Sequence, residues 1–300
     1  MTRHLTTIRE LSRADAEYIL AATAEFKKRW RRGETGRDLS GRMVGLFFEK
    51  ASTRTRLSFE AAVAALGGTP TFVDHSKERL GKREALKDFA RVVSRYLRAV
   101  VLRTYEQKTV DEVARHASVP VINGLSDHEH PCQALADLFT IREKFGDLAG
   151  RRLAFIGDGN NVARSLARLC RLLDVEFAIA SPKGYELSDV RKEAAGGKGL
   201  FFVEDPAEAV RGADALYADV WTSMGDKETP ERLAAFAKYR IDGKLLNLAK
   251  PGAIALHCLP AHRGQEITDE VMDGPQAAVY DQSENRMHVS AGVLQWVLKT

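Results

Sequence analysis

The segment Ser52-Thr53-Arg54-Thr55-Arg56 places hydroxyl and guanidinium groups where a strand-like apolar run, 43–48, gives way to a helical pattern, 53–66. Backbone N–H groups at the start of a helix have no partner within the helix and carry partial positive charge. With Ser52 at the N-cap and Arg54 in the first turn, this helix start is suited to bind a phosphate group. The alternative is a capped helix with a solvated basic first turn.

Two further segments supply donors for an anion or a carbonyl group. Arg103 ends the apolar run 99–102, and residues just past the carboxyl ends of parallel strands face the ligand crevice of a sheet. Its planar guanidinium can donate to a phosphate or carbonyl oxygen, although a surface arginine at a strand end is the alternative. His130 lies at a helix entrance before a proline, where it can polarise a carbonyl, and Gln133, one turn on, can bind an amide.

The segment 127–130 contains an aspartate, a glutamate and two histidines, which is a composition that also occurs in metal sites. His128 and His130 are only two residues apart, whereas a helical metal-binding pair needs the i, i+4 spacing. We therefore expect no metal at this segment.

A glycine-rich loop, 157–162, lies between a strand-like run and a helical pattern, as a dinucleotide-binding loop would. Its third glycine position is Val162, however, and the next strand-like run ends at Ala180-Ser181 without an acidic residue for a ribose. The loop therefore fits a nucleotide cofactor poorly. A nucleotide-dependent oxidoreductase remains an alternative only if this loop binds NAD.

An aspartate and a cysteine follow two later strand-like runs. Asp219 comes directly after 215–218, where it can pair with an ammonium group, while Ser223 adds a hydrogen bond and Met224 lines an aliphatic wall. The alternative is a turn with buried apolar side chains. Cys258 follows the run that ends at 257, and a lone cysteine at a strand end is more often a small buried apolar residue than a catalyst.

Five motifs, taken in this order, resemble those of the aspartate and ornithine carbamoyltransferase family. They are Ser-Thr-Arg-Thr-Arg at 52–56, His-Pro-x-Gln at 130–133, Gly-Asp-Gly-Asn-Asn at 157–161, Asp-x-x-x-Ser-Met-Gly at 219–225 and His-Cys-Leu-Pro at 257–260. The resemblance spans almost the whole chain. The motif at 219–225 is similar to that of the ornithine branch, because the aspartate enzymes lack it and need cations for a second carboxylate.

The resemblance implies two sets of site residues. Carbamoyl phosphate would be bound by Ser52, Thr53, Arg54, Thr55, Arg79, Arg103, His130, Gln133, Cys258, Leu259 and Arg286. Ornithine would be bound by Asn161, Asp219, Ser223 and Met224. Arg103, His130 and Cys258 would be the catalytic residues. Arg79 departs from the family pattern, since ornithine enzymes commonly have glutamine there; in the family, this loop reaches the site of a neighbouring subunit.

The activity implied is transfer of a carbamoyl group to the δ-amine of L-ornithine, which gives citrulline and phosphate without a metal or an organic cofactor. N-acylated ornithine and putrescine are alternative acceptors, but the first has no free α-ammonium for Asp219 and the second has neither α-group. A non-catalytic carbamoyl-phosphate sensor is a more distant alternative. The resemblance also implies a homotrimer with active sites near subunit interfaces, or a larger assembly of trimers.

These residues must be positioned by an alternation of short apolar runs and amphipathic helices, which predicts parallel sheets. We expect strands at 43–48, 71–73, 99–103, 119–122, 151–157, 176–180, 215–218 and 253–257. We expect helices after Ser12 and at 53–66, 83–96, 108–116, 131–145, 162–173 and 287–299. The fold class is therefore α/β, with two domains of similar size that each contain a parallel sheet flanked by helices.

The expected boundaries are 1–146 for a carbamoyl-phosphate-binding domain and 147–285 for an ornithine-binding domain. The resemblance further implies that a C-terminal helix, 286–300, packs back on the first domain. A chain of 300 residues has the length of two ordinary domains.

Composition narrows the classes of partner. The 45 basic and 41 acidic residues give a net charge of only +4, which does not favour nucleic-acid binding. Three widely spaced cysteines indicate neither a disulfide framework nor a zinc site, and they fit a reducing compartment. Neither a signal-peptide-like run at 1–11 nor a membrane-spanning window of about 20 apolar residues is apparent, so we expect a cytoplasmic protein without membrane contact.

Overall fold

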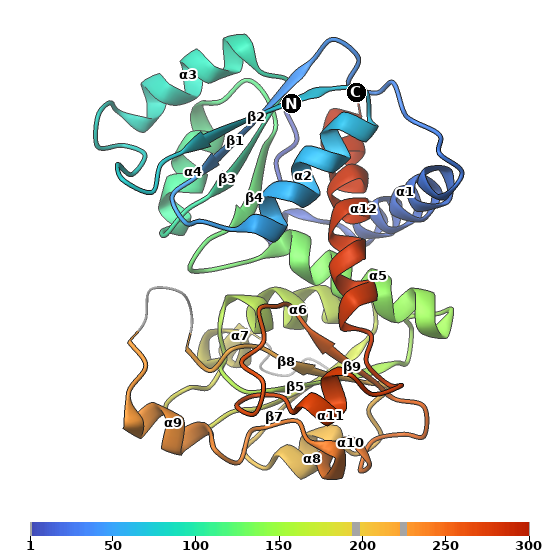
Figure 1. Ribbon diagram of the computed structural model, residues 1–300. Coiled ribbons are helices and arrows are strands. Elements are labelled where there is room, and N and C mark those ends of the chain that lie inside the picture. Colours follow the sequence, from blue (N-terminus) through green and yellow to red (C-terminus); the bar gives the residue numbers. More distant parts are fainter. Residues whose placement is uncertain (1, 194–198, 223–226, 300) are drawn as a thin grey trace. The chain divides into compact units, whose positions relative to one another are not determined.

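The computed structural model describes residues 2–193, 199–222 and 227–299 (Figure 1). The chain divides into two compact units, one made of Met1–Ala136 with Glu284–Thr300 and the other of Asp137–Ser283. The division falls within two helices, α5 (Pro131–Phe145) and α12 (Val279–Leu298), so each of these helices contributes residues to both units.

The first unit contains a four-stranded parallel sheet in the order β2-β1-β3-β4. Its strands are β1 (Met43–Phe48), β2 (Thr69–Asp74), β3 (Ala99–Arg103) and β4 (Val121–Leu125). Its helices are α1 (Arg13–Arg31), α2 (Thr53–Ala65), α3 (Leu86–Tyr96) and α4 (Gln107–His116), together with the start of α5 and most of α12. All five residues of β3 are buried, as expected for a parallel strand with both faces covered.

The second unit contains a five-stranded parallel sheet in the order β7-β6-β5-β8-β9. Its strands are β5 (Arg152–Ile156), β6 (Glu176–Ala180), β7 (Leu200–Val203), β8 (Ala215–Ala218) and β9 (Ile254–His257). The helices within it are α6 (Asn161–Leu172), α7 (Ser188–Glu193), α8 (Pro206–Val210), α9 (Pro230–Phe236), α10 (Gly243–Leu246) and α11 (Asp269–Met272). The predicted fold class, two α/β parts with parallel sheets, is confirmed.

The last helix belongs with the first unit, as predicted. The indole of Trp296 donates to Asp15 Oδ1 at 2.9 Å, and the buried Lys27 of α1 donates to Asn285 Oδ1 at 2.7 Å. The start of this helix was predicted wrongly, because α12 begins at Val279, eight residues before the expected 287. Within the described ranges, no helix is long and apolar enough to cross a membrane.

Strand order brings particular loops together at the carboxyl edge of each sheet. In the first unit, β1 lies between β2 and β3, and in the second, β5 lies between β6 and β8. Connections that leave such a central strand and its neighbours in opposite directions open a crevice in which α/β proteins bind ligands. The loops after β1 and β3, and those after β5 and β8, are therefore the places to look for a site.

Candidate active site

The start of α2 has the N-cap that the sequence predicts. Ser52 is the N-cap, with extended backbone angles (φ −161°, ψ 105°), and its side chain accepts from the Thr55 N–H at 3.4 Å. The Ser52 hydroxyl also lies 3.0 Å from Thr55 Oγ1. Thr53 is exposed and Arg54 is half-buried in the first turn. The remaining backbone N–H groups of this turn and the Arg54 guanidinium are thus placed at one helix end, where they can bind an anion.

Thr55 is the point at which the predicted phosphate-site residues of the first unit meet. Its hydroxyl is 3.3 Å from Arg103 Nη1 and 3.3 Å from Arg286 Nη2, and all three side chains are buried. Arg286 also donates through Nη1 to the Gln133 side-chain oxygen. Strand β3, helix α5 and helix α12 thereby bring two guanidiniums and an amide to the N-terminus of α2, an arrangement suited to a doubly charged anion.

Helix α12 is held against α1 by a buried lysine beside Arg286. Lys27 is 4% exposed, and its ammonium group contacts Asn285 Oδ1 at 2.7 Å and Glu284 Oε2 at 3.6 Å. The His288 ring lies 3.1 Å from Glu284 Oε1. These contacts fix the rotation of the helical turn that presents Arg286 to Thr55.

His130 lies buried beside the two guanidiniums, and its pKa is lowered well below 6.5. Burial is the main cause, and the positive charges of Arg286 and Arg103 act in the same direction. The ring is therefore neutral at physiological pH. A neutral imidazole can donate a hydrogen bond to a carbonyl oxygen, in keeping with the predicted role of His130.

We expect His130 to make the protein less stable on the acid side of pH 6.5. Because its pKa is lower in the folded chain than in the unfolded chain, the unfolded chain binds more protons between the two values. Its contribution is complete above about pH 6.5 and is lost as the pH falls, with a slope of up to about 1.4 kcal/mol per pH unit. Urea titrations at several pH values measure how the free energy of unfolding depends on pH. His130→Gln should remove the contribution of His130 to this dependence, whereas the same substitution at exposed His262 should retain it.

The loop that contains Arg79 is attached to the first sheet through Glu49. The buried Glu49 carboxylate accepts from the Leu80 N–H at 3.0 Å and from the Tyr105 N–H at 2.9 Å. The guanidinium of Arg79 stacks over the Tyr105 ring at 3.9 Å, and Lys50 lies over the same ring at 4.4 Å. Within this chain Arg79 is thus held by an aromatic face, and its contact with carbamoyl phosphate stays a prediction.

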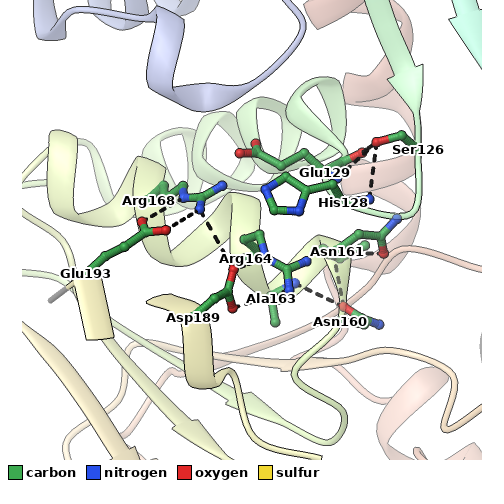
Figure 2. A network of polar contacts seen from close by, with 11 residues as sticks. Ser126, His128, Glu129, Asn160, Asn161, Ala163, Arg164, Arg168, Asp189 and Glu193 are labelled. Atoms are coloured by element: carbon green, nitrogen blue, oxygen red, sulfur yellow. Dashed lines mark hydrogen bonds and ion pairs between the residues drawn. The ribbon is translucent and has the colours of Figure 1, made fainter. Parts of the chain in front are cut away.

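In the second unit, the loop after β5 and the loop after β8 meet through Asn160 and Asp219. Asn160 is the N-cap of α6: its oxygen accepts from the N–H groups of Val162 at 3.0 Å and Ala163 at 3.1 Å (Figure 2). Its amide nitrogen donates to Asp219 Oδ2 at 2.7 Å. Asn160 was not predicted as a site residue. The overlooked signal was an asparagine immediately before an amphipathic helix, which is typical of an N-cap.

Asn161, the predicted carboxylate-binding residue, is the first residue of α6. Its own oxygen accepts from the Val162 N–H at 3.0 Å. Helix α6 is braced toward α7 by two ion pairs, Arg164–Asp189 and Arg168–Glu193, at 2.7 Å and 2.8 Å (Figure 2). The helix start that carries both asparagines is therefore firmly placed.

Asp219 accepts hydrogen bonds from three donors. Besides Asn160, the Val220 N–H donates at 2.8 Å, and Cys258 Sγ lies 2.8 Å from Asp219 Oδ1. The pKa of Cys258 is raised well above its usual value, first by burial and then by the Asp219 charge. Cys258 is thus a protonated thiol that donates to Asp219, which excludes it as a thiolate nucleophile.

The turn after Cys258 is fixed by a buried histidine. Leu259 has a positive φ of 59°, the Leu259–Pro260 bond is cis, and the Leu259 N–H donates to His257 Nδ1 at 2.8 Å. Because Nδ1 accepts, the ring proton resides on Nε2, which lies 2.9 Å from Glu266 Oε1. Cys258 and Leu259 belong to the second unit, whereas the other residues predicted for carbamoyl phosphate belong to the first.

Two predicted ornithine-site residues, Ser223 and Met224, lie outside the described residues. Over the part of the chain that the structure describes, no group of three or more His, Cys, Asp or Glu side chains is arranged to hold a metal ion. The geometry thus brings two buried guanidiniums and an amide to a helix N-terminus in the first unit. In the second unit it provides a carboxylate, a thiol and two asparagines at the switch point of the sheet.

The whole chain is similar to known carbamoyltransferases. The carbamoyl-phosphate-binding domain model of the aspartate/ornithine carbamoyltransferases matches residues 3–143, and the Asp/Orn-binding domain model matches 149–297. The ornithine carbamoyltransferase of Methanoculleus marisnigri is 48% identical over 98% of this chain and 96% of its own length. That of Bacillus subtilis is 46% identical over 99% of this chain and 94% of its own.

Solved structures agree with these sequence relationships. The ornithine carbamoyltransferase from Pyrococcus furiosus superposes with a TM-score of 0.94 at 41% identity, covering 99% of this chain and 97% of its own. The enzyme from Thermus thermophilus has a TM-score of 0.90 at 40% identity over the full length of both chains. The predicted family resemblance is confirmed: this chain belongs to the aspartate/ornithine carbamoyltransferase family.

Proposed function

We propose that this chain transfers the carbamoyl group of carbamoyl phosphate to the δ-amine of L-ornithine, releasing L-citrulline and phosphate. The observation that carries the choice of acceptor is the Asp219 carboxylate, which three donors hold in place at the switch point of the second sheet. A charged carboxylate there matches the free α-ammonium of ornithine, which N-acylated ornithine and putrescine lack. The relatives named above carry the same activity in their names.

The donor substrate is assigned to the anion site of the first unit. Ser52, Thr53, Arg54 and Arg286 would bind the phosphate, while Arg103, His130, Gln133 and Thr55 would bind the carbamoyl group. Arg79 would approach the phosphate of a neighbouring subunit, and Cys258 with Leu259 would meet the carbamoyl end. Asn161 would bind the α-carboxylate of ornithine, with Ser223 and Met224 contributing in the ornithine site.

The chemical step needs a neutral amine. The δ-amine of ornithine has a reference pKa near that of lysine, roughly 10, so it is mostly protonated in water. Burial and nearby arginines favour the neutral form. The Cys258 thiol, whose hydrogen is directed to Asp219, presents a sulfur lone pair that can accept from the amine and orient it.

The amine nitrogen then attacks the carbamoyl carbon. A C–N bond forms, the C–O bond to phosphate breaks, and the proton lost by the amine leaves with the phosphate. Arg103, neutral His130 and Thr55 stabilise the charge that develops on the carbonyl oxygen, and Arg54 and Arg286 stabilise the departing phosphate. Holding the two reactants in line supplies much of the acceleration and requires no covalent intermediate.

The proposal extends to assembly and location. We propose a homotrimer with active sites near subunit interfaces, because the family resemblance implies that the loop of Arg79 serves a neighbouring site; light scattering would show whether trimers associate further. We also propose a cytoplasmic location for the protein. The cysteines Cys132, Cys170 and Cys258 are free thiols, as expected in a reducing compartment.

The activity is tested by supplying carbamoyl phosphate with one of four acceptors: L-ornithine, N-acetyl-L-ornithine, putrescine or L-aspartate. Phosphate release and the mass of the carbamoylated product should show a preference for L-ornithine of at least about a hundredfold, which a lost charged contact of 2–3 kcal/mol would produce. Preference for another acceptor would contradict the assignment of Asp219. Binding of carbamoyl phosphate without transfer to any acceptor would favour a sensor.

A further inference from the structure

A second buried polar cluster lies behind the Cys258–Asp219 contact. It consists of Tyr217 on β8, Gln282 near the start of α12 and Asp137 on α5, which we call the Tyr217 cluster. All three belong to the second unit, and their side chains are at most 1% exposed. None of them was predicted as a site residue. Burying three polar side chains costs free energy that an apolar trio would avoid, so the cluster calls for an explanation beyond stability.

Gln282 connects the cluster to the strand that ends beside Cys258. Its amide nitrogen donates to Asp137 Oδ1 at 2.7 Å and to the Tyr217 hydroxyl oxygen at 3.2 Å. Its oxygen accepts from the backbone N–H of His257 at 2.8 Å, and His257 directly precedes Cys258. Both amide hydrogens and the amide oxygen are therefore engaged, which fixes the side chain and, through it, the end of β9.

Tyr217 connects the cluster to the strand that ends beside Asp219. It lies two residues before Asp219 in the sequence, and its hydroxyl oxygen accepts from the Gln282 amide at 3.2 Å. Burial and then the Asp137 charge raise the pKa of Tyr217 well above 10, so the hydroxyl stays protonated and can donate.

The hydroxyl is not needed for packing. The Tyr217 ring stacks on Phe155 with centroids 5.3 Å apart and an interplanar angle of 14°, and a phenylalanine would keep this contact. What the hydroxyl adds is an acceptor for the Gln282 amide, whose oxygen in turn holds the backbone N–H of His257. The residue before Cys258 is thereby fixed on its buried side, while Asp219 accepts the thiol hydrogen.

We propose that Tyr217 and Gln282 are positioning residues for carbamoyl transfer, which hold the end of β9 and the Cys258 thiol so that its hydrogen is directed to Asp219 and a sulfur lone pair remains for the substrate amine. This inference rests on the proposed function, because that amine is the δ-amine of ornithine. Neither residue touches the substrate. Their effect is therefore on the reacting geometry and not on the binding of the α-carboxylate and α-ammonium groups.

The first test compares Tyr217→Phe with Tyr239→Phe in the full chain. Tyr239 is also buried in the second unit, but its hydroxyl donates to the Glu204 carbonyl at 2.9 Å. We expect Tyr217→Phe to lower kcat with L-ornithine about tenfold while KM for L-ornithine changes less than about twofold. Tyr239→Phe should change neither. An unchanged kcat, or a raised KM with an unchanged kcat, would overturn the proposal.

A second readout does not depend on catalysis. Alkylation of Cys258 by iodoacetamide, followed by peptide mass spectrometry, reports how readily the reagent reaches the thiol and the thiolate forms. Tyr217→Phe removes the acceptor that fixes the Gln282 amide and loosens the end of β9, so alkylation should become at least about threefold faster, whereas Tyr239→Phe should react as the wild type does. An unchanged or slower rate would contradict the role of Tyr217. If the wild type failed to carbamoylate ornithine, the proposed function would be contradicted. The alkylation rates would still show whether Tyr217 holds the end of β9.

Gln282 provides an independent pair of variants. Gln282→Met removes the amide contacts with His257, Asp137 and Tyr217. Its control is Gln276→Met, because Gln276 also binds the β9 segment, donating to the Ala253 carbonyl at 2.8 Å at the opposite end of the strand. We expect a loss of kcat in Gln282→Met of at least about tenfold and none in Gln276→Met. An equal loss of kcat in the two variants would show that a general loosening of β9 is responsible, and no loss in either would contradict the role of Gln282.

Discussion

Replacing Arg286 by glutamine is expected to lower kcat/KM for carbamoyl phosphate by about three orders of magnitude. The Arg286 guanidinium is buried, contacts Gln133 and lies 3.3 Å from Thr55 Oγ1 at the N-terminus of α2. Removing a buried charge that meets a phosphate costs about 4 kcal/mol, which corresponds to a factor of about a thousand. Steady-state kinetics with varied carbamoyl phosphate, and calorimetric titration with inorganic phosphate, would measure the loss.

Two variants separate charge from geometry. Arg286→Lys keeps a positive charge but loses the planar fork, so we expect it to retain part of the activity lost in Arg286→Gln. Arg91→Gln removes an exposed guanidinium on α3, 3.8 Å from Asp88, and should change kcat/KM less than about twofold. If Arg286→Gln behaved as Arg91→Gln does, the phosphate would have to bind elsewhere.

Replacing Asp219 by asparagine is expected to raise KM for L-ornithine about a hundredfold. The substitution keeps the shape of the side chain but removes the charge that would pair with the α-ammonium group, a contact worth about 2–3 kcal/mol. It also introduces an amide into a place where three donors converge, from Asn160, Val220 and Cys258. The dissociation constant for carbamoyl phosphate should change less than about twofold, because its phosphate-binding residues belong to the other unit.

The choice of acceptor provides a sharper measure of this variant than KM alone. Since N-acetyl-L-ornithine has no α-ammonium, its kcat/KM should be much less affected, so the preference for L-ornithine over it should shrink. Asp205→Asn is a suitable control, because Asp205 is an exposed cap of α8 in the same unit. A preserved preference for L-ornithine in Asp219→Asn would assign recognition of the α-ammonium to another residue.

The features that could be predicted from the sequence are those determined by residues close together in the chain. Ser52 and Ser12 were predicted as helix caps and are caps, because a cap is formed by residues three positions apart. The buried strands β1 and β3 were predicted with their observed bounds, because an apolar run between polar segments is a local signal. The predicted roles of the individual site residues remain predictions.

Contacts across the chain could not be predicted. Asn160 reaches Asp219 over 59 positions, and this depends on β5 and β8 being neighbours, which no local pattern specifies. In the sequence, Tyr217 looks like an apolar strand residue, because the partner of its hydroxyl, Gln282, lies 65 positions later in the chain. Without the strand order and the helix packing, both residues look like ordinary members of a turn and a strand.

Short or marginal elements were missed for a different reason. Strand β7 was not predicted because it is a four-residue edge strand with no fully buried position, so its hydrophobic signal is weak. Helix α12 starts early through a polar stretch, 280–285, whose helical form is supported by tertiary contacts such as Lys144–Asp281 at 2.5 Å. Propensity alone would not extend the helix into such a segment.

The order β7-β6-β5-β8-β9 also gathers the residues predicted to bind the acceptor amine in a few loops. Few positions therefore need to change for the enzyme to accept a different amine. The carboxylate, the two asparagines and the thiol come from the ends of β5, β8 and β9, all within the second unit, whereas the anion site belongs to the first. A duplicated gene can therefore acquire a new acceptor through a few codons in these loops while its carbamoyl donor remains the same. A directed-evolution library for new amines needs to vary only the loops that follow these three strands.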